Sequence, residues 1–497
     1  MSDTYDKLIN RIKDVYRLES MAALLEWDQE TMMPKSGVAA RAEEVGLIAA
    51  LAHEHLIADE VRALLENAEG EGGLVAETNL REIKRKFDRA AKVPGELVRE
   101  IAETTALAKE AWAKARAECN FAGFAPLLSK VVDLKRKEAD LIGYETEAYD
   151  ALMDEFEPGA KAADIEKLFV ELVAASRPLL DKLMSAPSKP DPSILTRHYP
   201  RARQEELSRK MANAVNFDFD AGRADVSVHP FCTTIGGPGD VRITTRYLEH
   251  FLPAAVFGTL HESGHALYEQ GLPSEHRFTP MGEYISLGIH ESQSRMWENN
   301  VGRSRAFWEC HFVDLKKMFP ESMGDVSLDQ FYSAINTVAP SFIRVEADEL
   351  TYNLHIVIRF EIERALINGT LTVKDIPAVW SEKFNQYLGI TPPDDAQGCL
   401  QDIHWSMGAL GYFATYTLGN LYAAQFFAQA LADIPDLFDH IRANDHRPLL
   451  NWLRENIHQH GRRYRANELI QKVTNKPLSI EPYMTYVSQK FGDVYRA

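Results

Sequence analysis

A five-residue segment near the middle of the chain, His261-Glu262-Ser263-Gly264-His265, combines the residue types and the spacing of a metal site. It lies within residues 253–271, whose apolar residues recur at helical spacing, so we predict a helix there. Residues four apart share one face of a helix, so His261 and His265 can offer both imidazoles to one ion. Glu262 is rotated by about 100° from His261, which lets it act on a metal-bound water without being a ligand. The segment therefore predicts the hydrolytic chemistry of a zinc peptidase.

A catalytic zinc site needs a third protein ligand and keeps one position open for water. A histidine six residues after His265 would be typical of metzincins, but that residue is Gly271. We predict instead that the ligand comes from the next helical stretch, residues 289–298, with Glu291 as our choice. Helical periodicity does not rank this residue, so three alternatives stay open: Glu283, Glu298 and His290.

Composition and charge indicate a globular enzyme. The 497 residues are 45% hydrophobic and 26% charged, which is ordinary for a globular protein with a large core. The formal net charge of -18 argues against nucleic acid or an anionic membrane as the main partner. We find no signal peptide at the N-terminus and no apolar run of about 18 residues that would span a membrane. The four scattered cysteines fit reduced thiols, so we expect a cytoplasmic protein.

The helical period dominates the rest of the chain. Amphipathic helices are predicted over five segments: 8–27, 37–68, 74–119, 125–141 and 163–184. The charged stretch 83–116 could line a cleft or form a lid. The proline-rich segment 186–193 is predicted to be a surface loop.

One region departs from the helical pattern. Residues 226–233 and 240–247 are rich in β-branched residues and are separated by Gly236-Gly237-Pro238-Gly239. We predict a small sheet there, immediately before the metal helix. An edge strand of such a sheet could pair with an extended peptide. A purely structural hairpin that closes the core is an equal alternative.

Six motifs occur along the chain in a fixed order. They are His229-Pro230-Phe231; Asp240, Arg242 and Thr244; the metal pentapeptide; His290-Glu291-Ser292-Gln293; Ile343-Arg344-Val345-Glu346-Ala347-Asp348; and Gly398, Gln401, Asp402, His404 and Trp405. With this set, the chain resembles the carboxypeptidase Taq family of metallocarboxypeptidases over nearly its whole length. No motif position departs from the family pattern.

The resemblance implies an all-α, mainly helical fold of the gluzincin type, with a small β-sheet beside a deep active-site groove. Residues 1–497 would form one large domain, in which the N-terminal helices could be a lid. Family members are typically homodimers that use one divalent ion per subunit, zinc or cobalt. They release C-terminal amino acids from peptides with broad specificity and act poorly on proline. Carried over by motif, the metal ligands are His261, His265 and Glu291, and Glu262 is the general base.

The tetrahedral oxyanion needs a donor besides the metal, held in place before the reaction. His404, Tyr412 and Tyr416 are the candidates. The histidine has a motif behind it, whereas a packing role is equally open for the two tyrosines. Asp348 and Asp402 could orient the metal-ligating imidazoles.

An exopeptidase also needs a cation that binds the terminal carboxylate of its substrate. Arginine suits this role because its planar fork holds a carboxylate bidentately. Arg344 and Arg242 are our candidates, and His229 is assigned to substrate binding beside them. For each arginine the alternative is a structural ion pair with the acidic residue of its own motif, Asp348 or Asp240.

These residues together predict a metal-dependent carboxypeptidase in which Glu262 takes a proton from a metal-activated water. An oligoendopeptidase that applies the same chemistry to internal bonds of short peptides is the main alternative. A third hypothesis is a non-catalytic helical scaffold, against which the intact general base and ligands argue. The expected partners are peptides and a second copy of the chain, with no nucleic acid and no membrane.

Overall fold

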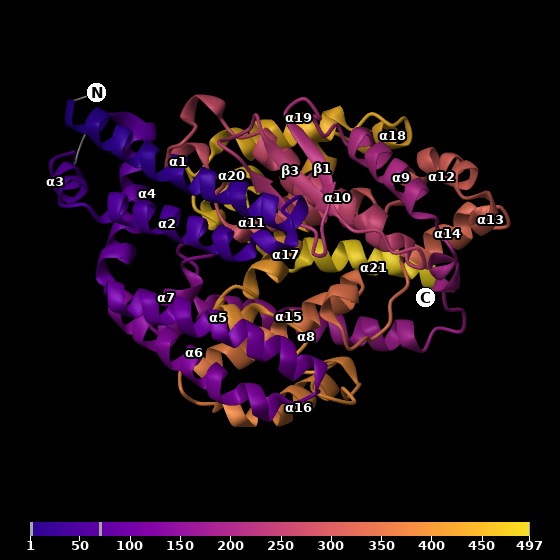
Figure 1. The fold of residues 1–497 in the computed structure, drawn as a ribbon. Coiled ribbons are helices and arrows are strands. Elements are labelled where there is room, and N and C mark those ends of the chain that lie inside the picture. Colours follow the sequence, from indigo (N-terminus) through magenta and orange to yellow (C-terminus); the bar gives the residue numbers. More distant parts are fainter. Residues whose placement is uncertain (1–2, 69–71, 497) are drawn as a thin grey trace.

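The computed structural model describes residues 3–68 and 72–496. The chain is predominantly helical, and a small sheet lies beside the central helices (Figure 1). This confirms the predicted all-α class with a small β-sheet. Among the helices of the described residues, none has the length and apolar content to cross a membrane.

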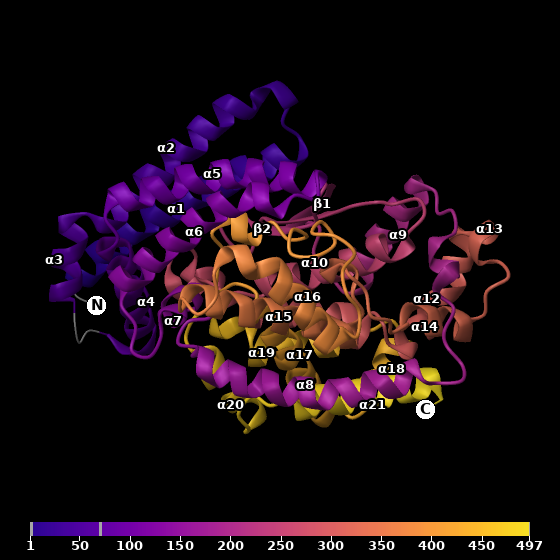
Figure 2. The same cartoon turned by 90° about the horizontal axis from the view of Figure 1, so that it is seen from below.

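Four N-terminal helices pack together at one side of the molecule (Figures 1 and 2). They are α1 (Asp3–Thr31), α2 (Val38–Ile57), α3 (Asp59–Asn67) and α4 (Gly73–Lys92). Their apolar faces bury a core of their own that includes Leu8, Ile12 and Phe87. Polar contacts join them to the rest of the chain, such as the ion pair of Arg85 with Asp154 at 3.1 Å.

Two predicted helices are each divided in the structure. Residues 37–68 form α2 and α3, because Ala58 is extended (φ -56°, ψ 142°) and the acidic Asp59 begins a new helix. Residues 74–119 form α4 and α5 (Gly95–Ala117), which are separated at Val93 and Pro94. Proline disfavours helical dihedrals in the residue before it, and Val93 is extended. The prediction of single long helices was therefore wrong at both places.

The remaining helices surround three central ones, α10 (Leu252–Gln270), α11 (Leu287–Arg295) and α17 (Ala414–Asp433) (Figure 1). The surrounding helices are α5, α6 (Phe121–Ile142), α7 (Ala148–Met153), α8 (Ala162–Met184), α9 (Arg201–Ala214), α12 (Arg305–Met318), α13 (Pro320–Met323), α14 (Leu328–Ile335), α15 (Glu349–Ile367), α16 (Ile376–Leu388), α18 (Leu437–Arg442), α19 (Arg447–Asn456), α20 (Ala466–Thr474) and α21 (Glu481–Tyr495). Helix α17 is apolar on most of its circumference and is almost entirely buried, as expected for a helix at the centre of a core.

The sheet has three short strands, β1 (Gly222–Val226), β2 (Cys232–Thr234) and β3 (Val241–Thr245), in the order β1-β3-β2. Strand β1 is parallel to β3, whereas β2 is antiparallel to it. The predicted continuous strand 226–233 was wrong, because Pro230 lacks a donor and divides β1 from β2. Strand β2 lies at an edge of the sheet.

Candidate active site

Helix α10 carries the two histidines of the pentapeptide. Its apolar residues are buried, so His261 and His265 have one fixed orientation on the partly exposed face. Gly264 lets α11 approach closely, because a Cβ atom added there would lie 2.6 Å from the carbonyl oxygen of Gln293. The pentapeptide glycine thus brings Glu291 of α11 to the histidines.

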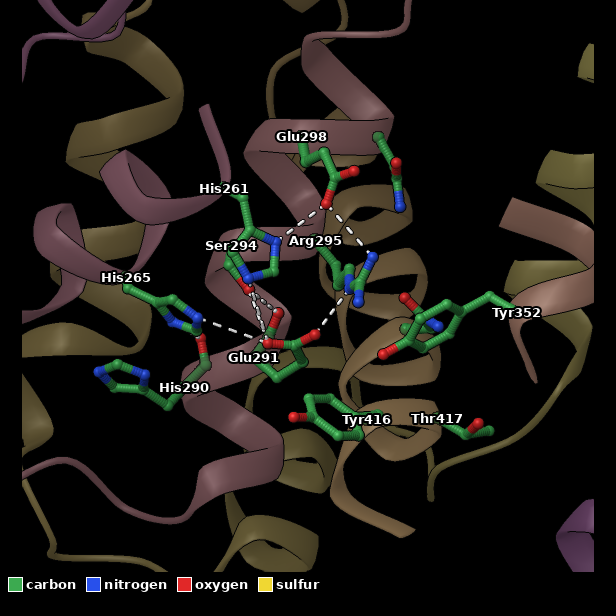
Figure 3. A network of polar contacts seen from close by, with 12 residues as sticks. His261, His265, His290, Glu291, Ser294, Arg295, Glu298, Tyr352, Tyr416 and Thr417 are labelled. Carbon is green, nitrogen blue, oxygen red and sulfur yellow. Dashed lines mark hydrogen bonds and ion pairs between the residues drawn. The ribbon is translucent and has the colours of Figure 1, made fainter. Parts of the chain in front are cut away.

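Three side chains converge between α10 and α11 (Figure 3). The Oε2 atom of Glu291 lies 3.7 Å from Nε2 of His261 and 3.4 Å from Nε2 of His265. One possible ligand atom from each residue falls within 4.8 Å of the others. Two imidazole nitrogens and one carboxylate oxygen are the donor set of a catalytic zinc site, so these residues fit a divalent ion. The structure thus brings together the three predicted ligands.

Both imidazoles are held by their other ring nitrogen. Nδ1 of His261 lies 2.9 Å from Oε2 of Glu298, and Nδ1 of His265 lies 3.0 Å from the carbonyl oxygen of His290. Because both partners are acceptors, each Nδ1 donates, which leaves the Nε2 lone pairs for an ion. The expectation that Asp348 or Asp402 orients these imidazoles was therefore wrong.

Glu298 lies in a π-helical turn, Met296–Val301, that directly follows α11. Such turns are rare and often occur at functional sites. Burial would raise the pKa of Glu298, but the charge of Arg295 and the hydrogen bond from His261 lower it to about 2. The carboxylate is therefore anionic and acts as a hydrogen-bond acceptor for His261, a predicted ligand.

The Glu291 carboxylate is equally constrained. It accepts hydrogen bonds from Nε of Arg295 at 2.6 Å and from the hydroxyl of Ser294 at 3.1 Å. Burial opposes ionisation, yet the adjacent Arg295 and His261 hold the pKa of Glu291 well below its ordinary value. Gly419 of α17 permits this packing, since a Cβ atom there would lie 2.5 Å from Cγ of Glu291.

The other candidates for the third ligand have different positions. Glu298 binds Nδ1 of His261, as described above. The ring of His290 stacks on His265 at 4.4 Å, and its Nε2 lies 2.9 Å from Glu269. Glu283 lies on the wall of a cavity and does not belong to the ligand cluster.

A cavity of about 520 Å³ opens above this cluster. Its lining residues come from α1, from β2 and the segments on either side of it, from α10, from the loop between α10 and α11, from α11, and from the start of α17 with the residue Tyr412 before it. Glu262 lies on its wall and is 6% exposed. Burial raises the pKa of the Glu262 carboxyl to about 7. A proton acceptor is thus located in the same cavity as the predicted ligands.

Tyr412 and Tyr416 also line the cavity, whereas His404 does not. Nε2 of His404 lies 3.3 Å from the hydroxyl oxygen of Tyr416, so it lies behind this tyrosine. Burial lowers the pKa of His404 to about 4, which favours the neutral ring. The two tyrosine rings are 5.3 Å apart.

The two predicted carboxylate anchors are both in ion pairs and outside the cavity lining. The Arg344 guanidinium donates to Asp402 at 2.8 and 3.0 Å and to the Tyr352 hydroxyl at 2.9 Å. Its partner is thus not Asp348, which instead caps the N-terminus of α15. Asp402 also accepts from the buried Arg359 at 2.7 Å.

Arg242 forms a bidentate pair with Asp240 at 2.7 and 2.8 Å, which is the structural alternative considered above. Its guanidinium also lies 4.2 Å from the ring centre of Trp27 in α1. His229 is exposed and lies beside the cavity wall formed by Pro230 and Phe231.

The roles of Glu298 and Arg295 around the ligands were not predicted. A signal was available, because Glu291, Arg295 and Glu298 follow each other at spacings of four and three residues and so share one helix face. Arg277, which lines the cavity, belongs to no motif and gave no signal in the sequence.

The fold and this cluster define a helical metallopeptidase of the His-Glu-x-x-His type with a downstream glutamate. The family model for carboxypeptidase Taq (M32) metallopeptidases matches residues 7–491, and the chain belongs to that family. It is therefore a metal-dependent carboxypeptidase and a peptide hydrolase, as the resemblance implied.

Individual relatives agree over the full length. The chain is 44% identical to thermostable carboxypeptidase 1 of Thermus thermophilus and 38% identical to carboxypeptidase 1 of Bacillus subtilis, with 99% of each chain covered. The solved structure of an M32 carboxypeptidase from Deinococcus radiodurans is 38% identical, covers 100% of both chains and superposes with a TM-score of 0.97.

Proposed function

We propose that this protein releases C-terminal amino acids one at a time from peptides, with one divalent ion per subunit bound by His261, His265 and Glu291. The ion is Zn²⁺, with Co²⁺ as the alternative, because the donor set of two imidazoles and one carboxylate suits both. The observation that carries the proposal is the convergence of two Nε2 atoms and one carboxylate oxygen within 4.8 Å at the cavity.

An ion held there lowers the pKa of a bound water toward about 7 and polarises the scissile carbonyl. Glu262 takes a proton from water and later transfers it to the nitrogen of the leaving amino acid. Its place on the cavity wall and its raised pKa both support this role. A carboxyl group with a pKa near the working pH can accept a proton and release it again.

The tyrosines supply the donor for the oxyanion in this proposal. Tyr416 and Tyr412 present hydroxyl groups from the cavity wall, and both are neutral donors because burial raises the pKa of each. His404 is 3.3 Å from Tyr416 and outside the cavity lining, so it positions that hydroxyl.

Three residues stay predictions for binding the substrate: Arg344, Arg242 and His229. Both arginines already have carboxylate partners. To bind the substrate carboxylate, either arginine would have to release its partner or bind both carboxylates at once. His229 is exposed beside the wall formed by Phe231 and could contact a substrate at the entrance.

The substrate backbone extends along β2 in this proposal. Thr233 and Thr234 line the cavity from an edge strand, which can pair with an extended peptide. Proline lacks the amide donor that such pairing uses, which is a physical reason for poor action on proline and broad action elsewhere. Helix α1 covers the same cavity with Tyr16 and Ser20, which supports a lid role for the N-terminal helices.

We further propose a homodimer in the cytoplasm. Several apolar side chains on α1, on α2 and in the turn between them are exposed, and exposed apolar surface can mark a contact surface. They are Met21, Leu24, Met32, Val38, Leu47 and Leu51. All four cysteines are free thiols, which fits a reducing compartment.

Peptides of one sequence with a free or an amidated C-terminus test the proposal. A carboxypeptidase removes single residues from the free acid and spares the amide. An oligoendopeptidase cleaves internal bonds of both peptides at similar rates, and that result would replace the proposal.

A further inference from the structure

The cavity has an unusual charge balance for an enzyme whose substrates end in a carboxylate. Five glutamates line it: Glu19, Glu262, Glu269, Glu283 and Glu291. Among the described lining residues, Arg277 alone is an arginine or lysine. A divalent ion on the three predicted ligands attracts an anionic group to the metal end of the cavity. Away from that ion, Arg277 is the fixed cation of this lining, so it decides where a carboxylate can bind there.

Arg277 is free to bind an anion. Its side chain is exposed, and its guanidinium forms no hydrogen bond or ion pair with another residue in the described part of the chain. The guanidinium lies 5.5 Å from the centre of the neighbouring Phe278 ring. Arg344 and Arg242, by contrast, already hold Asp402 and Asp240. The planar guanidinium of Arg277 therefore keeps its full set of donors for a ligand.

The surrounding loop and turn fix the position of Arg277. Arg277 lies in the loop that joins the two helices bearing the predicted metal ligands, α10 and α11. Its stem packs on the turn after β2, where a Cβ atom added to Gly237 would lie 2.9 Å from Cδ of Arg277. A side chain larger than that of glycine at this position would displace the arginine.

The next residue fixes the loop. Phe278 has a φ of 63°, a left-handed conformation that is costly for a bulky side chain and persists only when the surroundings enforce it. Its ring packs near Gly236 of the same turn and lies 5.6 Å from the guanidinium of Arg17 in α1. Strained residues of this kind cluster at ligand-binding sites. The contacts of the Phe278 ring that enforce this conformation also fix the backbone that carries Arg277.

We propose that Arg277 binds a carboxylate of the peptide substrate within the metal cavity. This role rests on the proposed carboxypeptidase function, and it assigns to Arg277 the binding of the substrate's negative charge. Two sources of this chemistry are distinguishable: the terminal carboxylate itself, or an acidic side chain near the C-terminus.

The test compares three forms of the metal-loaded enzyme: wild type, Arg277→Gln and Arg17→Gln. Arg17 is the matched control, because it contacts the same Phe278 ring but pairs with Asp14 and lies outside the cavity lining. The substrates are one blocked peptide with a free or an amidated C-terminus, and one free-acid pair with Glu or Gln as the penultimate residue.

We expect Arg277→Gln to lower kcat/KM by about 10- to 100-fold on the substrates whose carboxylate it binds, mainly through KM. The Arg17→Gln variant keeps the wild-type values. A reduced preference for the free over the amidated terminus assigns the terminal carboxylate. A reduced preference for Glu over Gln alone assigns the side chain.

Unchanged ratios for both substrate pairs in Arg277→Gln, with wild-type kcat/KM, overturn the inference. The failure of the proposed function looks different, because wild type itself would then release no C-terminal residue from any of these peptides. Arg277→Lys gives a further check. It keeps the charge but loses the bidentate fork, so an intermediate KM is expected.

Discussion

The carboxylate of Glu298 lies 2.9 Å from Nδ1 of His261, and this contact spans the two helical segments that build the metal cluster. The same carboxylate accepts from Arg295 at 3.3 Å and from Arg303 at 3.4 Å, so its own position is fixed. An imidazole oriented in this way has one tautomer and directs its Nε2 at the other ligands. Residues outside the predicted ligand set therefore orient the site.

Replacing Glu298 should weaken metal binding. We expect Glu298→Ala to reduce the affinity for Zn²⁺ by about 10- to 100-fold, because His261 loses the acceptor that fixes its ring. A competition titration against a fluorescent chelator measures this change. Glu283→Ala is the matched control, since that carboxylate lies on the same cavity wall outside the cluster. Equal affinities for both variants would contradict the orienting role of Glu298.

Glu262→Gln should separate metal binding from turnover. The proposed ligands His261, His265 and Glu291 remain, so we expect one ion per subunit by elemental analysis. Turnover should fall by at least about 10²- to 10⁴-fold, because the amide cannot take a proton from water. Activity close to that of wild type in the metal-loaded variant would exclude Glu262 as the general base.

The two tyrosines can be ranked by removing one hydroxyl at a time. Removal of a hydrogen-bond donor to the oxyanion raises the activation barrier by about 2.7–4 kcal/mol, which corresponds to a loss of about 10²- to 10³-fold in kcat. We expect this loss for Tyr416→Phe or for Tyr412→Phe, with KM little changed. Wild-type kcat in both variants would assign the pair to packing.

The ion-pair network behind His404 should be a stability element. Asp402 pairs with the guanidinium groups of both Arg344 and Arg359, and both arginines are buried. We expect Asp402→Asn to lower the free energy of unfolding by about 3–5 kcal/mol, because it leaves buried charges without a partner. Asp314→Asn, in an exposed pair with Lys317, should change it by less than about 1 kcal/mol. Urea denaturation distinguishes the two outcomes.

A buried glutamate away from the metal predicts a pH dependence of stability. Burial raises the pKa of Glu157 from 4.5 to about 7, so between these values the folded protein binds more protons than the unfolded chain. Stability then falls as the pH rises, by up to about 3 kcal/mol from this group. The free energy of unfolding of wild type and of Glu157→Gln is measured by urea denaturation at pH 5 and at pH 8. The difference between the variant and wild type should shift in favour of the variant as the pH rises from 5 to 8. An equal difference at both pH values would refute this.

Local patterns in the sequence were sufficient to predict the helical class and the metal cluster. His261 and His265 share a helix face by spacing alone, and the motif order identified Glu291 as their partner. These features depend on residues close together in the chain or on a pattern that the family carries.

Other features depend on contacts between distant segments. The pairing of Arg344 with Asp402 instead of Asp348 follows from the approach of the loop before η8 (His404–Met407) to η6 (Arg344–Glu346). The division of two long helices was readable in part, because Pro94 marks one break, whereas Ala58 has no such signal. The cavity location of Arg277 arises from a strained loop, which no periodicity encodes.

Metal-dependent release of residues from a free C-terminus can be followed in a time course. A blocked dipeptide and a longer peptide are incubated with enzyme, with enzyme plus chelator, and with chelated enzyme after addition of Zn²⁺ or Co²⁺. We expect stepwise release of single C-terminal residues that stops with chelator and returns with metal. Release that continues in chelator, or internal cleavage as the first event, would contradict it.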